Sequence, residues 1–305
     1  MIFQLKILGN NSAVPAHNRN QTSQLLQLDN QYILIDCGEG TQMQLSKHHI
    51  RLGRIKTVLI SHLHGDHYFG LIGLISTMHL FHRHQKLTIF APPELEQILN
   101  LQLKVSETVL NFELEFVPLD HQNSKVIIKD EQFFVEAFPL DHGIKCYGFL
   151  IKENPKQWRI DKKTIPEGIG IQEIIQLKKG KDVLHDDGTI KYKLEEYTLP
   201  PRPSRSYAFC SDTRFNDDIV PYIQGVDLLY HEATFTDEMK DRAALTHHST
   251  ARDAATIASK AGVKKLLLGH YSTRYKDPQP LLDEALLVFK ESYLSQEGET
   301  ISLME

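Results

Sequence analysis

Three histidines and one aspartate lie within six residues of the segment SHLHGDH, directly after the apolar run KTVLI. His62 and His64 are two residues apart, so on an extended chain their side chains point the same way and can share one metal ion. We expect the chain to turn at Gly65, which lets Asp66 and His67 face a second metal nearby. Imidazole suits zinc, and a carboxylate can complete a site that keeps an open position for water. The alternative is a histidine-rich surface turn without a metal.

Further aspartates and histidines follow three other apolar runs. Asp141 and His142 come after FFVEAF, Asp212 comes shortly after SYAF, and His270 comes after VKKLLL and one glycine. In open α/β sheets, ligands bind outside the carboxyl ends of the strands. Each residue alone could be a capped or solvated loop residue, and a lone histidine such as His142 is more often structural. Their shared position after apolar runs favours one common site.

The elements that must position these residues are short strands alternating with helices, the pattern of an α/β layered fold. Helices are expected after Pro93, after Ser249-Thr250 with an end near Gly262, and after Pro280. The segment 152–205 interrupts this pattern with many Pro and Gly residues, and its length favours a functional insertion over a merely solvated loop. Strands are predicted at residues 3–7, 25–28, 32–35, 55–60, 133–138, 207–210, 226–230 and 263–268.

Composition narrows the class of protein. The 305 residues fit one large or two ordinary domains, and 41% apolar residues are typical of a globular chain with a proper core. The net charge of −5 argues against a nucleic-acid binder held by bulk charge, although residues 152–205 carry 12 Lys and Arg against 9 Asp and Glu. Three cysteines without CxxC spacing exclude a disulfide framework. The chain shows neither a secretory signal nor a membrane-spanning run, so we expect a cytoplasmic protein without a membrane partner.

The order of these motifs also carries a resemblance. HxHxDH, then DHG, SDT and GH resembles the metallo-β-lactamase superfamily, and within it the ribonuclease Z family of endonucleases that trim tRNA 3′ ends. HxHxDH alone is specific only for the superfamily. Four further motifs support the narrower match: DCGEGTQ at 36–42, HEAT at 231–234, HST at 248–250 and HYSTRY at 270–275.

The resemblance implies a metallo-β-lactamase-like αββα sandwich over residues 1–305, a single domain with an inserted substrate-binding arm at about 152–205. It implies two zinc ions per chain and a homodimer in which the arm of one subunit serves tRNA bound at the other. Asp36 would hold the HxHxDH loop, although it could instead be a turn aspartate. The first zinc would be bound by His62, His64 and His142, the second by Asp66, His67 and His270, and Asp212 would bridge both.

The activity implied is removal of the 3′ trailer from precursor tRNA by metal-hydroxide phosphodiester hydrolysis, leaving a 3′-hydroxyl on the tRNA. In this chemistry Asp66 would orient the hydroxide and take its proton. His248 is not needed as a ligand, so it is the candidate general acid for the leaving oxygen, with Glu232 holding its other ring nitrogen. Its alternative role is that of a helix-flanking residue. The residues expected to seat the RNA backbone are Ser272, Arg274 and Tyr275, although Arg274 packed over Tyr275 is an equally simple arrangement.

Two features depart from the family pattern. The inserted segment reads IPEGIG at 165–170, without the Gly-Pro step of the family arm. The family loop PxKxRN is PAHNRN at 15–20, so His17 stands where lysine is expected.

Two other functions compete with the implied one: a small-molecule phosphodiesterase or other hydrolase on the same fold, and a metal-stabilised RNA-binding scaffold without catalysis. The long insertion counts against the first, and the presence of both Asp66 and His248 counts against the second.

Overall fold

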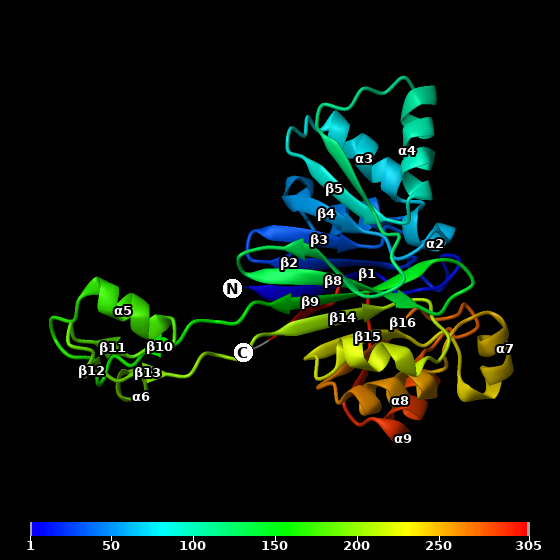
Figure 1. The fold of residues 1–305 in the computed structure, drawn as a ribbon. Helices are drawn as coiled ribbons and strands as arrows, with labels where there is room; N and C mark the ends of the chain where they lie inside the picture. The colour runs from blue at the N-terminus through cyan, green and yellow to red at the C-terminus, as the bar shows by residue number, and fades with distance from the viewer. Residues whose placement is uncertain (1, 304–305) are drawn as a thin grey trace.

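Two seven-stranded sheets packed face to face form the centre of the computed structural model, which describes residues 2–303 (Figure 1). The strands of the first sheet are Phe3–Gly9 (β1), Ser23–Leu28 (β2), Gln31–Ile35 (β3), Ile55–Leu59 (β4), Leu87–Ala91 (β5), Leu114–Pro118 (β6) and Thr300–Ser302 (β18). Those of the second are Lys125–Lys129 (β7), Phe133–Leu140 (β8), Cys146–Glu153 (β9), Ser206–Cys210 (β14), Leu228–Glu232 (β15), Leu266–Gly269 (β16) and Ser292–Leu294 (β17). The strand orders are β18-β1-β2-β3-β4-β5-β6 and β17-β16-β15-β14-β9-β8-β7.

Helices cover the outer face of each sheet, which completes the expected αββα layering. The first sheet carries Thr41–Lys47 (α1), Gly65–Tyr68 (α2), Leu71–Leu80 (α3), Glu94–Val105 (α4) and the 3-10 turn Leu52–Arg54 (η1). The second carries Ala251–Ala261 (α8), Gln279–Val288 (α9) and the 3-10 segment Asp217–Ile223 (η2). The short elements Asp237–Met239 (η3) and Lys240–Leu245 (α7) lie beside the sandwich, on the right of Figure 1. Across residues 2–303, no helix has the length and apolar character needed to cross a bilayer.

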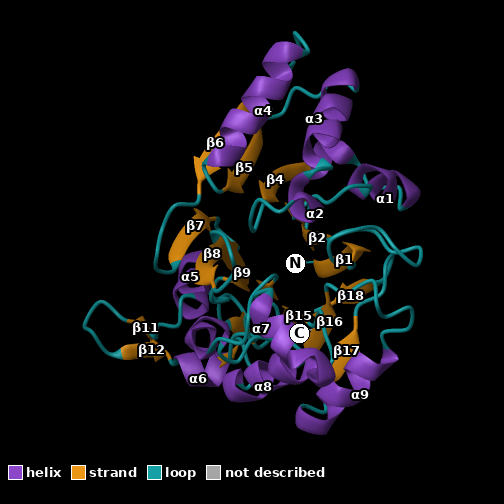
Figure 2. Ribbon diagram, turned by 90° about the vertical axis from the view of Figure 1, so that its right-hand side faces the viewer, coloured by secondary structure: helices purple, strands orange, loops and turns teal. Residues whose placement is uncertain are grey.

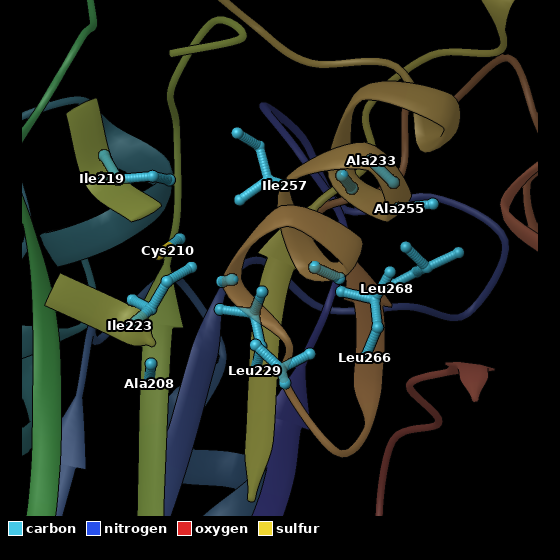
Figure 3. Close-up of a cluster of buried hydrophobic side chains, with 14 of the residues drawn as sticks. Ala208, Cys210, Ile219, Ile223, Leu229, Ala233, Ala255, Ile257, Leu266 and Leu268 are labelled. Atoms are coloured by element: carbon cyan, nitrogen blue, oxygen red, sulfur yellow. The ribbon is translucent and has the colours of Figure 1, made fainter. Parts of the chain in front are cut away.

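Alternation along the strands divides the core into layers. In β14, Tyr207 and Phe209 pack between the two sheets, whereas Ala208 and Cys210 face the helices. Figure 3 shows Ala208 and Cys210 on the helical side, together with Leu229 of β15. Each strand of the sandwich therefore contributes to two cores, because successive side chains point to opposite faces.

The predicted elements are largely confirmed. The helices after Pro93 and Thr250 are α4 and α8, and Gly262 ends α8 with a left-handed φ of 59°. The third helix begins at Gln279, one residue before the proline. The predicted start of a strand at Val263 is wrong by three residues, because the Val263 N–H closes the end of α8 by donating to the Ala258 carbonyl. The turn predicted at Gly65 takes the form of the short helix α2.

Strands that run in one direction bring the predicted site residues to one edge of each sheet. β3 and β4 are parallel in the first sheet, and β14, β15 and β16 are parallel in the second. β8 has the direction of β14, because both pair antiparallel with β9 between them. Gly38 lets the two loops after β3 and β4 meet, since a Cβ there would lie 2.5 Å from the Asp66 carbonyl oxygen.

Residues 154–204 leave this sandwich between β9 and β14 and form a separate projection on the left of Figure 1. They lie within the range predicted as an inserted arm and form elements of their own. These are Arg159–Ile160 (β10), Ile171–Lys178 (α5), Val183–Leu184 (β11), Ile190–Tyr192 (β12), Leu194–Tyr197 (α6) and Thr198–Leu199 (β13). At its base the Arg205 guanidinium is 2.5 Å from the Glu153 carboxylate, and both side chains are almost fully buried.

Candidate metal centre

The structure brings all seven predicted ligands together at the strand ends. His62 follows β4, His142 follows β8, Asp212 follows β14 and His270 follows β16. Three groups have ligand atoms within 4.8 Å of one another: His62, His64, His142 and Asp212 in the first, Asp66, His67 and His270 in the second, and Asp212, His248 and His270 in the third. The third group shares two members with the others and adds only His248. The first two groups are the two sets expected from the sequence.

Asp212 lies between the first two groups. Its Oδ2 is 3.6 Å from Nε2 of His62 and 3.7 Å from Nε2 of His142. Its Oδ1 is 3.3 Å from Nε2 of His67 and 3.1 Å from Nε2 of His270. One carboxylate therefore presents one oxygen to each group, the arrangement that a bridging ligand needs.

The donor set fits two divalent metal ions. Nε2 of His67 and Nε2 of His270 are buried without a hydrogen-bond partner in the protein, although such atoms are normally satisfied. Burial lowers the pKa of His62, so its ring stays neutral and keeps a lone pair for a metal. Imidazole nitrogens with carboxylate oxygens suit zinc among the common metals.

Asp36, which follows β3, holds the HxHxDH loop from beneath. Its fully buried carboxylate accepts hydrogen bonds from the Ser61 N–H at 2.7 Å and from the Ser61 hydroxyl at 2.8 Å. It also lies 2.7 Å from Nδ1 of His67, which fixes that ring with Nε2 toward the centre. Burial opposes protonation of His67, but Asp212, Asp66 and Asp36 outweigh it and raise the pKa of this histidine.

His248 and Glu232 form a second arrangement beside the two groups. Nδ1 of His248 is 2.9 Å from Oε1 of Glu232, the last residue of β15. Burial lowers the pKa of His248, but the Glu232 carboxylate overrides this and raises it to about 9. The His248 ring lies 5.3 Å from that of His142 and 5.4 Å from that of His270, measured between centroids. The His248 ring thus lies close to one candidate ligand from each group.

Full-length relatives show which family has this site. Ribonuclease Z of Cytophaga hutchinsonii is 48% identical to the chain over 298 residues, which cover 98% of this chain and 95% of that protein. Ribonuclease Z of Bacteroides fragilis is 41% identical over 302 residues, 99% of both chains. The chain belongs to the ribonuclease Z family.

Structural comparison agrees with this family and with the predicted fold. Human tRNase Z, short form, superimposes with a TM-score of 0.72 at 29% identity, over 99% of this chain and 100% of the human chain. A metallo-β-lactamase fold protein of Bacillus subtilis, 18% identical, has a TM-score of 0.71 over 99% of this chain and 100% of its own, which supports the fold alone. The family model described as Anti-Pycsar protein Apyc1 matches residues 3–189. That match ends before Asp212, His248 and His270, whereas the matches to the two ribonuclease Z relatives extend over 98% and 99% of this chain.

Three functional contacts of this ribonuclease Z family site were missed by the sequence analysis. The Thr234 hydroxyl donates to Oε2 of Glu232 at 2.5 Å and lies 3.0 Å from Nδ1 of His270, so it links the His248 pair to a candidate ligand. The Ala13 N–H donates to Oδ2 of Asp66 at 2.8 Å. Ser61 supplies the two bonds to Asp36 described above. The HEAT motif pointed to Thr234 only as a family signature, and no side-chain pattern can reveal a backbone donor such as Ala13.

The residues expected to contact substrate separate into two kinds. Ser272 and Arg274 line a cavity of about 570 Å³ that His248 also lines. Tyr275 points elsewhere: its hydroxyl accepts from the Thr236 N–H at 2.9 Å and so braces the loop after β15. The structure therefore places two of the three beside His248 and gives Tyr275 an internal partner.

The loop that departs from PxKxRN is held against the loop after His270. Nε2 of His17 is 2.8 Å from the Thr273 carbonyl oxygen. Arg19 donates to the Tyr275 carbonyl at 2.6 Å and to the Lys276 carbonyl at 3.1 Å. Both side chains are thus engaged in ordering the site.

Proposed function

We propose that this chain is a metal-dependent endoribonuclease that removes the 3′ trailer from precursor tRNA and leaves a 3′-hydroxyl on the tRNA. The observation that carries the proposal is the His248–Glu232 pair beside the two His/Asp groups, because a general acid is needed when the leaving group is a ribose oxygen. Family membership over the full length supports the same activity.

The residues of the site would have separate roles in metal binding and proton transfer. His62, His64 and His142 would hold one zinc ion, Asp66, His67 and His270 the other, and Asp212 would contact both. When bound, such a pair of ions activates water and neutralises charge on the phosphate. Oδ2 of Asp66 accepts from the Ala13 N–H and lies 3.4 Å from Nε2 of His67 and 3.5 Å from Nε2 of His270, so it is the oxygen that would contact the ion. Oδ1 would then orient the attacking water and take its proton.

His248 would donate its proton to the leaving 3′-oxygen from Nε2, because Nδ1 faces Glu232. Glu232 keeps that orientation through bonds of its own. It accepts from the Thr213 N–H at 2.8 Å and from the Thr234 hydroxyl at 2.5 Å. Fixing the carboxylate in this way leaves the imidazole in one tautomer and one position, which proton transfer requires.

The arm would grip substrate bound at a partner subunit. β9 begins four residues after His142 and runs away from the metal centre, so its eight residues carry the chain about 23 Å from that edge at about 3.3 Å per residue. Figure 1 shows the arm extending still further, on the side opposite α2 and α7. An arm in this position cannot reach its own metal centre, which is why the proposal includes a homodimer.

Four exposed apolar side chains on the first helical layer mark the candidate dimer face. Met43, Phe69, Leu80 and Phe81 are 75%, 60%, 70% and 74% exposed. They belong to α1 and to the ends of α2 and α3, helices that lie together in Figure 2. Apolar patches of this kind commonly mark protein interfaces. Light scattering of the purified chain and of Phe81→Asp tests this: we expect a dimer that the aspartate converts to monomer, together with slower tRNA cleavage.

Cleavage assays test the activity itself. We expect the zinc-loaded protein to cut a precursor tRNA once, at the trailer junction, giving a tRNA with a 3′-hydroxyl and a trailer with a 5′-phosphate. A small aryl phosphodiester should be hydrolysed with far lower kcat/KM, because it cannot use the arm. A protein that prefers the small substrate would instead be a small-molecule phosphodiesterase, and the proposal would fail. The relatives from Cytophaga hutchinsonii and Bacteroides fragilis are bacterial proteins, and bacteria make tRNA precursors in the cytoplasm. We therefore also propose that location, which cell fractionation would check.

A further inference from the structure

A cavity next to His248 is built from parts of the chain that also touch the metal centre. It has a volume of about 570 Å³, within the usual range for ligand sites. Its walls are Ser12–Val14, the α7 region with Arg242 and Thr246, and the segment 272–274. Ala13 and Thr234, both in its lining, are hydrogen-bonded to Asp66 and His270 respectively. A group bound in the cavity is therefore held directly beside the reacting atoms.

Two arginines line this cavity without a carboxylate partner. Arg242 and Arg274 are both exposed, and neither forms an ion pair with any residue of the described range 2–303. The neighbouring arginines differ: Arg214 is 2.7 Å from Asp141, and Arg252 is 3.3 Å from Asp237. Arg19 is fully occupied by carbonyl oxygens, as described above. The cavity thus combines two uncompensated guanidinium groups with several hydroxyl groups.

This chemistry is that of a phosphate site. A guanidinium binds phosphate oxygens with two parallel hydrogen bonds, and the Ser272 hydroxyl, which accepts from the Arg274 N–H, can donate to a remaining oxygen. No acidic side chain lines the cavity, so an anion entering it meets no opposing charge from the walls. A nucleotide with its phosphate matches both the volume and the charge.

We propose that Arg242, together with Arg274, binds the phosphate on the 5′ side of the nucleotide whose 3′-oxygen leaves. The proposal rests on the function given above, since it uses the role of His248. The nucleotide that receives the proton from His248 must lie on the His248 side of the scissile phosphate. His248 also lines a smaller cavity, but that one contains Asp253, and its Arg214 and Arg252 are paired with carboxylates. We therefore assign the nucleotide to the larger cavity, where its own 5′-phosphate meets the two arginines.

Arg242 is on this view a positioning residue that recognises a second phosphate. It orients the nucleotide so that the leaving oxygen meets His248, and a substrate with a single phosphate gains nothing from it. Lys240, two residues earlier on α7, lies on the other side of His248, in a cavity of about 320 Å³ that also contains Asp253. It has the same charge on the same helix and therefore serves as the matched control.

Combining a substitution in the protein with a change in the substrate tests the contact between Arg242 and the phosphate. Precursor tRNA is assembled with either a phosphate or an uncharged methylphosphonate at the linkage immediately 5′ of the scissile bond. Arg242→Ala should lower kcat/KM on the all-phosphate precursor by roughly tenfold to a hundredfold, the range expected for a charged hydrogen bond. The methylphosphonate should lower wild-type kcat/KM by a similar factor and cause Arg242→Ala little further loss. Lys240→Ala should show the full methylphosphonate penalty.

Two further measurements distinguish a direct contact between Arg242 and the phosphate from a general effect of lost charge or lost folding. Arg242→Lys, which keeps the charge but not the paired hydrogen bonds, should recover part of the loss, and melting temperatures of all variants show whether the fold is intact. The assignment of Arg242 would be overturned if the loss from Arg242→Ala and the loss from the methylphosphonate multiplied when combined. It would also be overturned if the methylphosphonate left the wild-type rate unchanged. If the loss in Arg242→Ala depended instead on a methylphosphonate placed in the trailer, Arg242 would contact the 3′ side of the scissile bond, and the assignment to the 5′ side would be wrong. A wild-type protein that does not cut the all-phosphate precursor contradicts the proposed function instead.

Discussion

His248 offers the sharpest test of the proposed chemistry. Replacing it with alanine removes the group that faces the leaving oxygen, while the seven candidate ligands and their hydrogen bonds to Asp36 and Thr234 stay in place. A positioned general acid contributes roughly 10²–10⁴ in rate, so turnover of precursor tRNA should fall by that factor. Binding of the precursor should change little, because His248 acts on the transition state.

The pH profile provides a second readout. The acid must be protonated, and the Glu232 carboxylate raises the pKa of His248 to about 9. Wild-type turnover should therefore persist through neutral pH and decline as the pH rises toward 9. Glu232→Gln keeps the shape of the side chain but removes its charge, so the alkaline decline should move toward roughly 6.5, the ordinary value for histidine.

Single-turnover cleavage across pH 6–10, with metal content measured for each variant, provides the assay. An aryl phosphodiester with a nitrophenolate leaving group is the control substrate, because that oxygen leaves without a proton. The loss in His248→Ala should be much smaller on it. Equal losses on both substrates, or a variant that no longer retains metal, would show that His248 supports the site structurally and would refute the reasoning.

Three further predictions follow from the site and the arm. Asp212→Ala should purify with fewer than two metal ions per chain and without activity, as measured by elemental analysis; full activity with one metal or none would exclude the bridging role. Deleting residues 154–204 should abolish efficient tRNA cleavage but spare the aryl phosphodiester, and equal loss on both substrates would make the arm structural. Glu153→Gln should lower the free energy of unfolding by roughly 3 kcal/mol at pH 7, because it breaks a buried ion pair with Arg205. Burial opposes ionisation of Glu153, yet Arg205 keeps its pKa below the ordinary 4.5, so the difference from wild type should shrink as the pH falls below that value; a constant difference in denaturant titrations would contradict this.

Local sequence rules were sufficient for the parts of the site that lie close together along the chain. Period-two alternation put His62 and His64 on one side of an extended segment, and the apolar runs before Asp212 and His270 identified the strand ends at which they lie. Thr250 and Gly262 marked the ends of α8 because a hydroxyl cap and a left-handed residue are local requirements. Such features depend on neighbours within a few residues, so a single sequence contains them.

Other features exist only once the layers pack. Asp36 reaches His67 across two adjacent strand ends, and Arg242 of α7 lines the same cavity as Arg274 of the loop after β16. The direction of the arm away from the metal centre follows from the antiparallel course of β9, which no local pattern indicates. The sequence by itself was enough to predict which residues would form the site and which strands hold them. Tertiary structure decided which of them touch, because contacts between distant residues depend on sheet order and layer packing rather than on spacing along the chain.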